Sequence, residues 1–465
     1  MVPRIRSITP VAVAAAALAV LGAAPAADVV PVTLAVAGRA NANVSIAARD
    51  ALVVAAWGAS RDGAADVFAA VSRDGGRSFG APIRVNATPG EAALGGERAP
   101  RVAIAPRPGG AAIGVLWTAK APAAVAGAPA GVPAPGPVIR LAESIDLGRT
   151  FAAPIDLSGR NAPGIRGWAA LAAGADGAWY AAWLDGRAEA AKKAAATTAA
   201  PVAANGGTNA TATAPAADAA GMSGHQHHHG GSSGAGPLQE VYYRVVGREA
   251  PAAEALGATG VCFCCKTAIL GPGTSDTGRP GGREMVLAWR HIFPNSERDI
   301  ALSVLDPGTG RQGAMVRVSE DRWQLQACPD DGPSLAANAS GTIHVVWPTL
   351  AEPGAGDAAP QKAIYHARTS DGRTFTPRRR LDRPGSGAAH PVVAALASGP
   401  ALALWDEVAD GARRIVAQPL REPAEPQVLG AGTYPAVAAS DDAFVVAWTA
   451  GSGDTAVVRV QRVGR

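Results

Sequence analysis

Three of the four cysteines stand almost side by side in the middle of the sequence, as Cys262-Phe263-Cys264-Cys265. The fourth, Cys328, begins the segment Cys-Pro-Asp-Asp-Gly-Pro. Thiolates are soft ligands that suit Cu(I) and Zn(II). The Cys-x-Cys-Cys spacing differs from that of a zinc ribbon. We therefore expect these four residues to bind a soft metal ion, copper ahead of zinc.

Histidines supply further donor atoms for such a site. His291 follows a predicted strand and His390 precedes another, and we include both as expected metal ligands. Four more histidines, at 225 and 227–229, lie in a stretch rich in Ala, Thr, Gly and Ser at 188–236. This stretch has too few large apolar residues to order itself, so we predict a disordered insertion. Its histidines are either a capture arm for metal or an accident of composition.

The beginning of the sequence predicts export. Arg4 and Arg6 form a short positive head, an apolar run follows at 11–21, and Ala24-Pro25-Ala26 supplies small residues for cleavage. We predict a signal peptide over 1–26, a single domain over 27–465, and a periplasmic or secreted protein. The net charge is +4, and the chain shows no basic stripe with interleaved aromatic residues, which speaks against a nucleic-acid partner. No later stretch predicts a membrane span.

Disulfide bonds are the alternative role for the cysteines. An even number of cysteines in an exported protein favours pairing. A bridge from Cys328 to the Cys262 segment would stabilise the fold by ~3–4 kcal/mol. Cys264 and Cys265 fit this role poorly, because a bridge between sequence neighbours is strained. A mixed outcome, one disulfide beside a metal ion, also remains open.

Internal repeats predict the fold that positions these residues. A short apolar strand containing tryptophan recurs along the chain, and the steps from Trp289 to Trp347 and on to Trp405 are each 58 residues. The other members of the series are Trp57, Trp117, Trp183 and Trp448. Another short strand usually precedes each of these, and one or two follow. We predict an all-β propeller of four-stranded blades, with seven repeats counted and six blades as the alternative. The segment 31–36 is expected to complete the last unit.

Turns of one particular kind carry a family resemblance. Ser72-Arg73-Asp74-Gly75-Gly76-Arg77-Ser78-Phe79 fits the pattern Ser-x-Asp-x-Gly-x-Ser/Thr-aromatic, as does the segment 144–151. The segment 369–375 is one residue shorter. This pattern resembles the Asp-box, or BNR-repeat, of the sialidase (neuraminidase) superfamily of β-propellers. The resemblance implies a sialidase-like fold, and in that family the box is a folding element on the face opposite the active site.

A narrower resemblance covers residues 261–347. The Cys-x-Cys-Cys and Cys-Pro-x-x-Gly-Pro elements, with Trp289-Arg290-His291 between them, are similar to a group of exported bacterial sialidase-like proteins of unassigned function. The resemblance implies a shared site and no particular reaction.

Propeller topology predicts which residues share a face. Loops that enter the innermost strands, and loops between second and third strands, lie around the central mouth. All four cysteines, His291 and His390 fall in such positions. So do further ligand-face candidates: Arg98, Arg166, Arg290, Arg298, Asp299, Asp406, Glu407 and Tyr434. We expect Arg298 and Asp299 to form a buried ion pair that holds their loop.

Two other functions use the same face. A sialidase needs an arginine cluster, a tyrosine nucleophile with a glutamate, and an acid/base carboxylate. Arg98, Arg166 and Arg290 supply charge, Tyr434 or Tyr243 a phenol, and Glu407 or Glu240 a carboxylate, but the full set cannot be assembled by position. An exo-sialidase-like hydrolase or sugar-binding propeller is therefore the second hypothesis. A disulfide-stapled scaffold for a protein partner is the third.

Overall fold

The computed structural model describes residues 30–123, 133–199, 239–247, 253–273, 284–324, 331–351, 361–421 and 423–464. Residues 31–465 form one compact unit. The predicted signal peptide, Cys328 and the histidines at 225–229 lie outside the described residues. Within them, no helix is long and apolar enough to cross a membrane.

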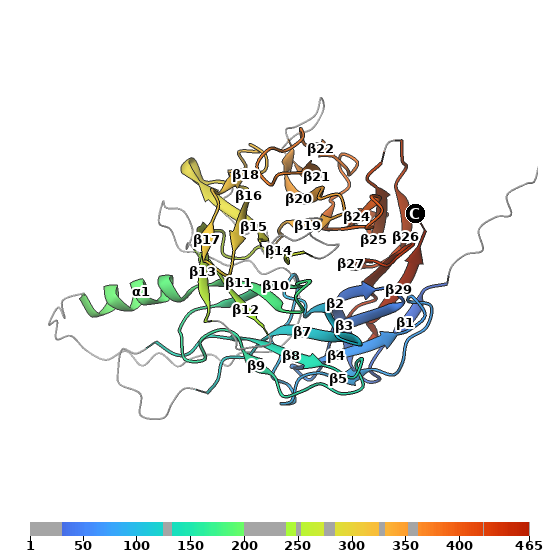
Figure 1. Cartoon of the computed structure of the whole chain (residues 1–465), viewed down its shortest axis with the longest axis horizontal. Coiled ribbons are helices and arrows are strands. Elements are labelled where there is room, and N and C mark those ends of the chain that lie inside the picture. Colours follow the sequence, from blue (N-terminus) through green and yellow to red (C-terminus); the bar gives the residue numbers. More distant parts are fainter. Residues whose placement is uncertain are drawn as a thin grey trace, which may run out of the picture. The chain divides into compact units, whose positions relative to one another are not determined.

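The first two sheets each contain four consecutive antiparallel strands (Figure 1). One is β2 (Ala40–Arg49), β3 (Leu52–Arg61), β4 (Ala64–Ser72) and β5 (Ile83–Arg84). The other is β6 (Arg101–Arg107), β7 (Gly110–Ala119), β8 (Val138–Ser144) and β9 (Ile155–Asp156). Short strands joined by tight turns are what the alternating Val/Ala runs and glycine-rich turns predict.

The middle of the chain forms a nine-stranded sheet that holds two successive repeats. Its first part is β10 (Arg166–Ala173), β11 (Trp179–Asp185), β12 (Gln239–Val246) and β13 (Ala255–Val261). Its second part is β14 (Ala268–Leu270), β15 (Met285–Phe293), β16 (Glu297–Asp306), β17 (Arg311–Gln312) and β18 (Val316–Arg317). The two parts are joined by one pair, Val261 with His291.

The remaining strands form three more four-stranded sheets. Two are β19 (Ser334–Ala337), β20 (Ile343–Ala351), β21 (Gln361–Thr369), β22 (Arg379–Arg380), and β23 (Ala389–Ala395), β24 (Ala401–Ala409), β25 (Ala412–Pro419), β26 (Gln427–Ala431). The third has β27 (Thr433–Ala439), β28 (Phe444–Ala450) and β29 (Val457–Val463), with β1 (Val32–Leu34) added at its edge. The predicted completion of the last unit by the segment 31–36 is therefore confirmed. This pairing covers an edge that would otherwise be open.

The innermost strands surround a common axis. Residues of β2, β6, β10, β14, β19, β23 and β27 line one central cavity of about 230 Å³. Each of these strands contacts the next, and β27 contacts β2. The fold is a sialidase-like β-propeller, as predicted.

The repeated tryptophans pack in the core. Each lies in the second strand of its unit, and none is more than 2% exposed. Large rings at equivalent positions fill the space between adjacent sheets, and the small Ala and Val residues around them let the sheets approach closely.

The Asp-box turns have the hydrogen bonds that their residues predict. The Asp74 carboxylate accepts from the backbone N–H groups of Arg77 and Ser78 and from the Ser78 hydroxyl. These bonds, the one from the Ser78 side chain above all, hold the pKa of Asp74 well below its usual range. The boxes at Asp146 and Asp371 repeat the pattern.

The insertion differs from the prediction in its first part. Residues Arg187–Ala199 form the helix α1 (Figure 1), whereas we predicted disorder over 188–236. Alanine and lysine have high helix propensity, and this outweighs the lack of large apolar side chains.

A buried histidine pair generates a prediction about stability. His344 and His366 lie on β20 and β21 with Nδ1 and Nε2 3.0 Å apart. Burial lowers the pKa of His344 to about 4 and, with the nearby His344, that of His366 to about 3. Between about pH 6.5 and these lower pKa values, the unfolded chain binds more protons than the folded chain does. Stability should therefore fall on acidification by up to about 1.4 kcal/mol per pH unit for each histidine.

Denaturant unfolding of the wild type and His366→Gln between pH 4 and pH 8 tests this expectation. The variant should lose about half of the acid slope below pH 6.5. Above pH 7 both histidines are neutral, and the two proteins should show the same slope there. An unchanged slope between pH 4 and pH 6 would contradict the assignment.

Candidate functional site

Three cysteine sulfurs come together in the loop between β13 and β14. The Sγ atoms of Cys262, Cys264 and Cys265 all lie within 4.8 Å of one another. The Sγ atoms of Cys262 and Cys265 lie 3.9 Å apart. No cysteine of the group is more than 4% exposed, and Trp168 and Phe263 pack against them.

Backbone hydrogen bonds tie this loop to its neighbours. The Cys262 N–H donates to the Arg290 carbonyl at 2.9 Å, and the Thr267 N–H donates to the Trp168 carbonyl at 3.1 Å. Trp168 lies at a register shift of β10 with φ of 50°. This sparsely populated conformation costs free energy, so the surrounding packing must enforce it. The loop is thus anchored on both of its sides.

Two buried arginines place positive charge beside the sulfurs. Arg298 Nη1 donates to Cys262 Sγ at 3.1 Å. Arg290 donates to the carbonyls of Arg298 and Pro348, and its guanidinium lies over the Trp323 ring. Within the described ranges, neither arginine pairs with a carboxylate. A thiolate is therefore the anion closest at hand for Arg298.

This environment shifts the pKa values of the two free thiols in opposite directions. A hydrogen bond from Cys265, together with the charges of Arg298 and Arg290, lowers the pKa of Cys262 to about 6 despite its burial. Burial raises the pKa of Cys265 well above its usual value, and its S–H donates to Cys262. Cys262 is accordingly the thiolate of the pair.

The sulfur geometry fits a soft metal ion. Two sulfurs about 2.3 Å from one ion lie about 3.8 Å apart at a tetrahedral angle and about 4.0 Å apart at a trigonal one. The observed 3.9 Å falls between these values. Cys262 and Cys265 are free, while Cys264 takes part in a disulfide. Two free thiols are therefore available as the protein stands, and three after reduction.

The structure places the two predicted histidine ligands outside this sulfur group. His291 Nδ1 accepts from Trp289 Nε1 at 3.3 Å, and its ring packs edge-on against Phe293. His390 Nδ1 lies 2.8 Å from Asp406 Oδ2, and its ring centroid is 4.0 Å from that of Tyr434. Cys328, the other predicted ligand, is outside the described residues.

Several of the predicted ligand-face residues have structural partners. Arg166 is fully buried and pairs with Asp185 at 2.9 Å. The expected Arg298–Asp299 pair is wrong, because Asp299 pairs with Arg317 while Arg298 turns to Cys262. Neighbouring side chains on a strand point to opposite faces, so these two cannot meet.

Some of the other candidate residues make structural contacts, and others lie at the mouth of the propeller. Glu407 accepts from Trp405 Nε1 and Arg414. Asp406 accepts from Arg413 and from the Tyr434 backbone, in addition to its contact with His390. The Arg98 guanidinium lies over the Trp168 ring at 5.4 Å.

A second cavity of about 190 Å³ opens where the innermost strands begin. Its walls include Glu97, Arg101, Lys266, His390 and Tyr434. These residues come from three sheets and from the loop that bears the cysteines. Residues at or just before the starts of several innermost strands therefore line one cavity in the described part of the chain.

Buried charged side chains from different parts of the chain form ion pairs at this mouth. Lys266 Nζ lies 2.7 Å from Glu97 Oε1 and 3.8 Å from Asp331 Oδ1. Lys362 pairs with Asp331 Oδ2 at 2.8 Å. Glu97 Oε2 is buried and has no hydrogen-bond partner among the described residues. Burial raises the pKa of Glu97 to about 7, although Lys266 opposes this.

Sequence reasoning missed Glu97, Lys266 and Asp331. All three stand next to residues that were singled out: Glu97 before Arg98, Lys266 after Cys265, and Asp331 within the Cys-Pro-x-x-Gly-Pro element. Their position before innermost strands was the available signal.

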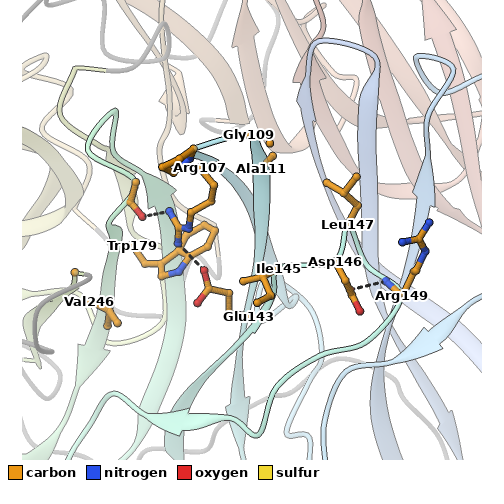
Figure 2. A pocket seen from close by; sticks show the side chains of 14 residues that line it. Arg107, Gly109, Ala111, Glu143, Ile145, Asp146, Leu147, Arg149, Trp179 and Val246 are labelled. Carbon is orange, nitrogen blue, oxygen red and sulfur yellow. Dashed lines mark hydrogen bonds and ion pairs between the residues drawn. The ribbon is translucent and has the colours of Figure 1, made fainter.

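A larger cavity of about 720 Å³ lies beside the Asp box at Asp146 (Figure 2). Arg107 lies over the Trp179 ring there, at 5.5 Å from its centroid, and pairs with Glu143 at 2.5 Å. Arg107 and Glu143 pair with each other there, and no thiol or histidine lines the cavity. We therefore place the candidate site at the mouth and its cysteines.

No protein-family model matches the sequence, and no curated protein matches it. Solved structures do share the fold. A polysaccharide lyase, the PL25 ulvan lyase, is 11% identical with a TM-score of 0.50, over 92% of this chain and 94% of that one. The Hadza microbial sialidase Hz136 is 12% identical with a TM-score of 0.46, over 91% of this chain, which spans 66% of the length of that one. The sialidase of Trypanosoma rangeli is 9% identical with a TM-score of 0.44, over 83% and 55%.

The likeness to the ulvan lyase supports a β-propeller fold, and at such an identity it concerns the fold alone. What the mouth does has to be argued from its own residues.

The mouth ion pair generates a stability prediction. Replacing Lys266 by Met removes the cation that opposes the raised pKa of Glu97, so at pH 8 the buried carboxyl must either stay charged without a partner or take up a proton, which should cost about 3–5 kcal/mol relative to the wild type, where Glu97 is ionised at that pH. The double variant Glu97→Gln/Lys266→Met should recover most of this loss. Urea unfolding measures both.

The exposed Lys192 of α1 offers a matched control. Lys192→Met should change stability by no more than about 0.5 kcal/mol. A Lys266→Met variant as stable as the control at pH 8 would contradict the proposed ion pair.

Proposed function

We propose that this chain is an exported, non-catalytic propeller that binds one soft metal ion at its cysteine cluster, copper ahead of zinc. The observation that carries the proposal is the approach of three sulfurs to within 4.8 Å, two of them free thiols 3.9 Å apart. Such a group of sulfurs suits Cu(I) and Zn(II) above harder ions.

Charge favours copper over zinc. Cu(I) held by two thiolates carries one negative charge, whereas Zn(II) held by two is neutral. Arg298 and Arg290 are buried beside the sulfurs without carboxylate partners among the described residues. A buried cation is stabilised by an anionic neighbour, so the anionic copper complex is the better match.

Cys262 and Cys265 would hold the ion as the protein stands. Cys264 would join them only when its disulfide is reduced. We propose that Cys328 is the disulfide partner of Cys264, because it is the one remaining cysteine of the chain. Residues His291 and His390 are lesser candidates, since each has other partners.

Metal analysis of the anaerobically purified protein tests this function. We expect about one copper ion per chain after loading with Cu(I), and weaker retention of Zn(II). Cys262→Ser and Cys265→Ser should each lower the apparent copper affinity by about tenfold or more, because each removes one of two thiolates.

Two controls locate the metal. A variant lacking residues 200–236 removes the histidine-rich stretch and keeps α1, and it should retain full copper stoichiometry. His291→Ala should do the same. Copper lost with the deletion and kept in both serine variants would overturn the proposal.

A second candidate function belongs to the mouth cavity. The observation that favours it is the unpartnered Glu97 Oε2, an acceptor buried beside a cavity of about 190 Å³ with Tyr434 at its wall. A hydroxyl group would satisfy this oxygen. The volume lies below the roughly 300–1,000 Å³ of drug-sized sites, so it admits one small ring rather than a chain.

The surroundings of Arg166 and Arg290 do not favour sialidase activity as the function of the mouth cavity. Arg166 and Arg290 are fully buried, and their guanidiniums donate to Asp185 and to backbone carbonyls. They are not available to bind the carboxylate of a sugar acid. The mouth therefore favours binding of a neutral hydroxyl-bearing ring.

Saccharide binding and cleavage test this candidate. We expect no sialic acid release from sialyllactose. On an array of neutral and acidic saccharides, any neutral sugar bound by the wild type should bind about tenfold more weakly to Glu97→Gln, because a hydrogen bond to a charged group is lost. Lys192→Met should bind as the wild type does. Release of sialic acid, or binding unaffected by Glu97→Gln, would contradict it.

A further inference from the structure

Cys262 and Cys265 are placed for a reaction with each other. They are three residues apart, both are free, and their sulfurs are 3.9 Å apart. A disulfide has its sulfurs about 2.05 Å apart. The residues between them lie in a turn rather than in a strand, so rotation of the two side chains can close this gap without breaking a strand pair.

The two thiols have different surroundings. Arg298 donates to Cys262 Sγ at 3.1 Å, and a cation at this distance favours the nucleophilic sulfur anion. Cys265 donates its S–H to Cys262 and has no such cation in hydrogen-bond contact. One sulfur is thus prepared to attack an oxidant, and the other lies beside it to complete the reaction.

We propose that Cys262 and Cys265 form a redox-active dithiol whose substrate is a small hydroperoxide. The Cys262 thiolate attacks the terminal oxygen of the O–O bond and that bond breaks, giving a sulfenic acid and a leaving hydroxide or alkoxide, which takes up one proton from solvent to become water or an alcohol. The Cys265 sulfur then attacks the sulfenic sulfur, the S–S bond forms, and hydroxide leaves and takes up the Cys265 proton as water. In total, two thiols are oxidised and one hydroperoxide is reduced.

Burial selects the size of the oxidant. Cys262 is 0% exposed and Cys265 is 2% exposed. Another protein cannot bring a disulfide to these sulfurs without opening the loop. Hydrogen peroxide is close to water in size, and Phe263 and Trp168, which cover the sulfurs, are themselves only half-buried.

The dithiol chemistry requires no metal, but its consequence rests on the proposed function. A Cys262–Cys265 disulfide would remove both free cysteine sulfurs from the metal site. Oxidation would therefore release the ion, and a bound ion would protect the pair from peroxide.

Peroxide treatment of the full chain tests the proposal. The protein is freed of metal, exposed to hydrogen peroxide, alkylated without reduction and digested. We expect Cys262 and Cys265 to lose alkylation together, and the peptide that carries them, which stays joined to its partner through the Cys264 disulfide, to lose two hydrogens. Cys265→Ser should instead hold Cys262 as a sulfenic acid that reacts with dimedone.

Arg298 provides a graded control. Arg298→Lys keeps the charge and should keep most of the rate, whereas Arg298→Met should slow oxidation by about tenfold or more. The wild-type peptide map stands by itself if Arg298→Met fails to fold. Two thiols that stay alkylatable after peroxide, or a bridge from Cys262 to Cys264, would overturn the dithiol. Because this assay contains no metal, its failure leaves the copper stoichiometry of the proposed function unaffected.

Discussion

Buried positive charge is the constraint on which the cysteine site depends. Arg290 and Arg298 lie inside the protein, at 0% and 2% exposure, with no carboxylate partner among the described residues. Arg290 donates to backbone carbonyls, and its guanidinium lies over the Trp323 ring. Arg298 reaches the Cys262 sulfur instead, and so an anionic sulfur is favoured in a place where burial alone would keep it neutral. The proposed metal binding and the proposed peroxide chemistry both draw on this same thiolate.

The propeller connects this site to the mouth through one short loop. Cys265 belongs to the sulfur group, and the next residue, Lys266, crosses the mouth to Glu97. The loop is therefore held from two directions, by its backbone bonds to Trp168 and Arg290 and by a buried ion pair. A change of oxidation state or of bound ion at the sulfurs is thus one residue away from the charges that line the mouth.

The internal sequence repeats made the fold predictable, but only part of the candidate site could be predicted from the sequence. The recurring tryptophans and the Asp-box turns mark second strands and turns, because core packing and turn chemistry depend on local residue type. The meeting of three cysteines followed from their closeness in sequence. The contact of Arg298 with Cys262 could not be predicted from the sequence. The direction of the Arg298 side chain depends on the pleating of its strand and on the ion pair that Arg317 forms with Asp299. The Glu97–Lys266 pair joins residues 169 apart in the chain, and only the ring brings them together.

X-ray absorption at the copper edge is the most direct test of the central claim. The account predicts that Cu(I) in the loaded protein has sulfur neighbours alone, two in the protein as purified and three after reduction of the Cys264 disulfide. It also predicts that Cys262→Ser removes one of these sulfurs. Nitrogen or oxygen neighbours in place of sulfur, or a spectrum unchanged by Cys262→Ser, would contradict a copper site at the cysteine cluster.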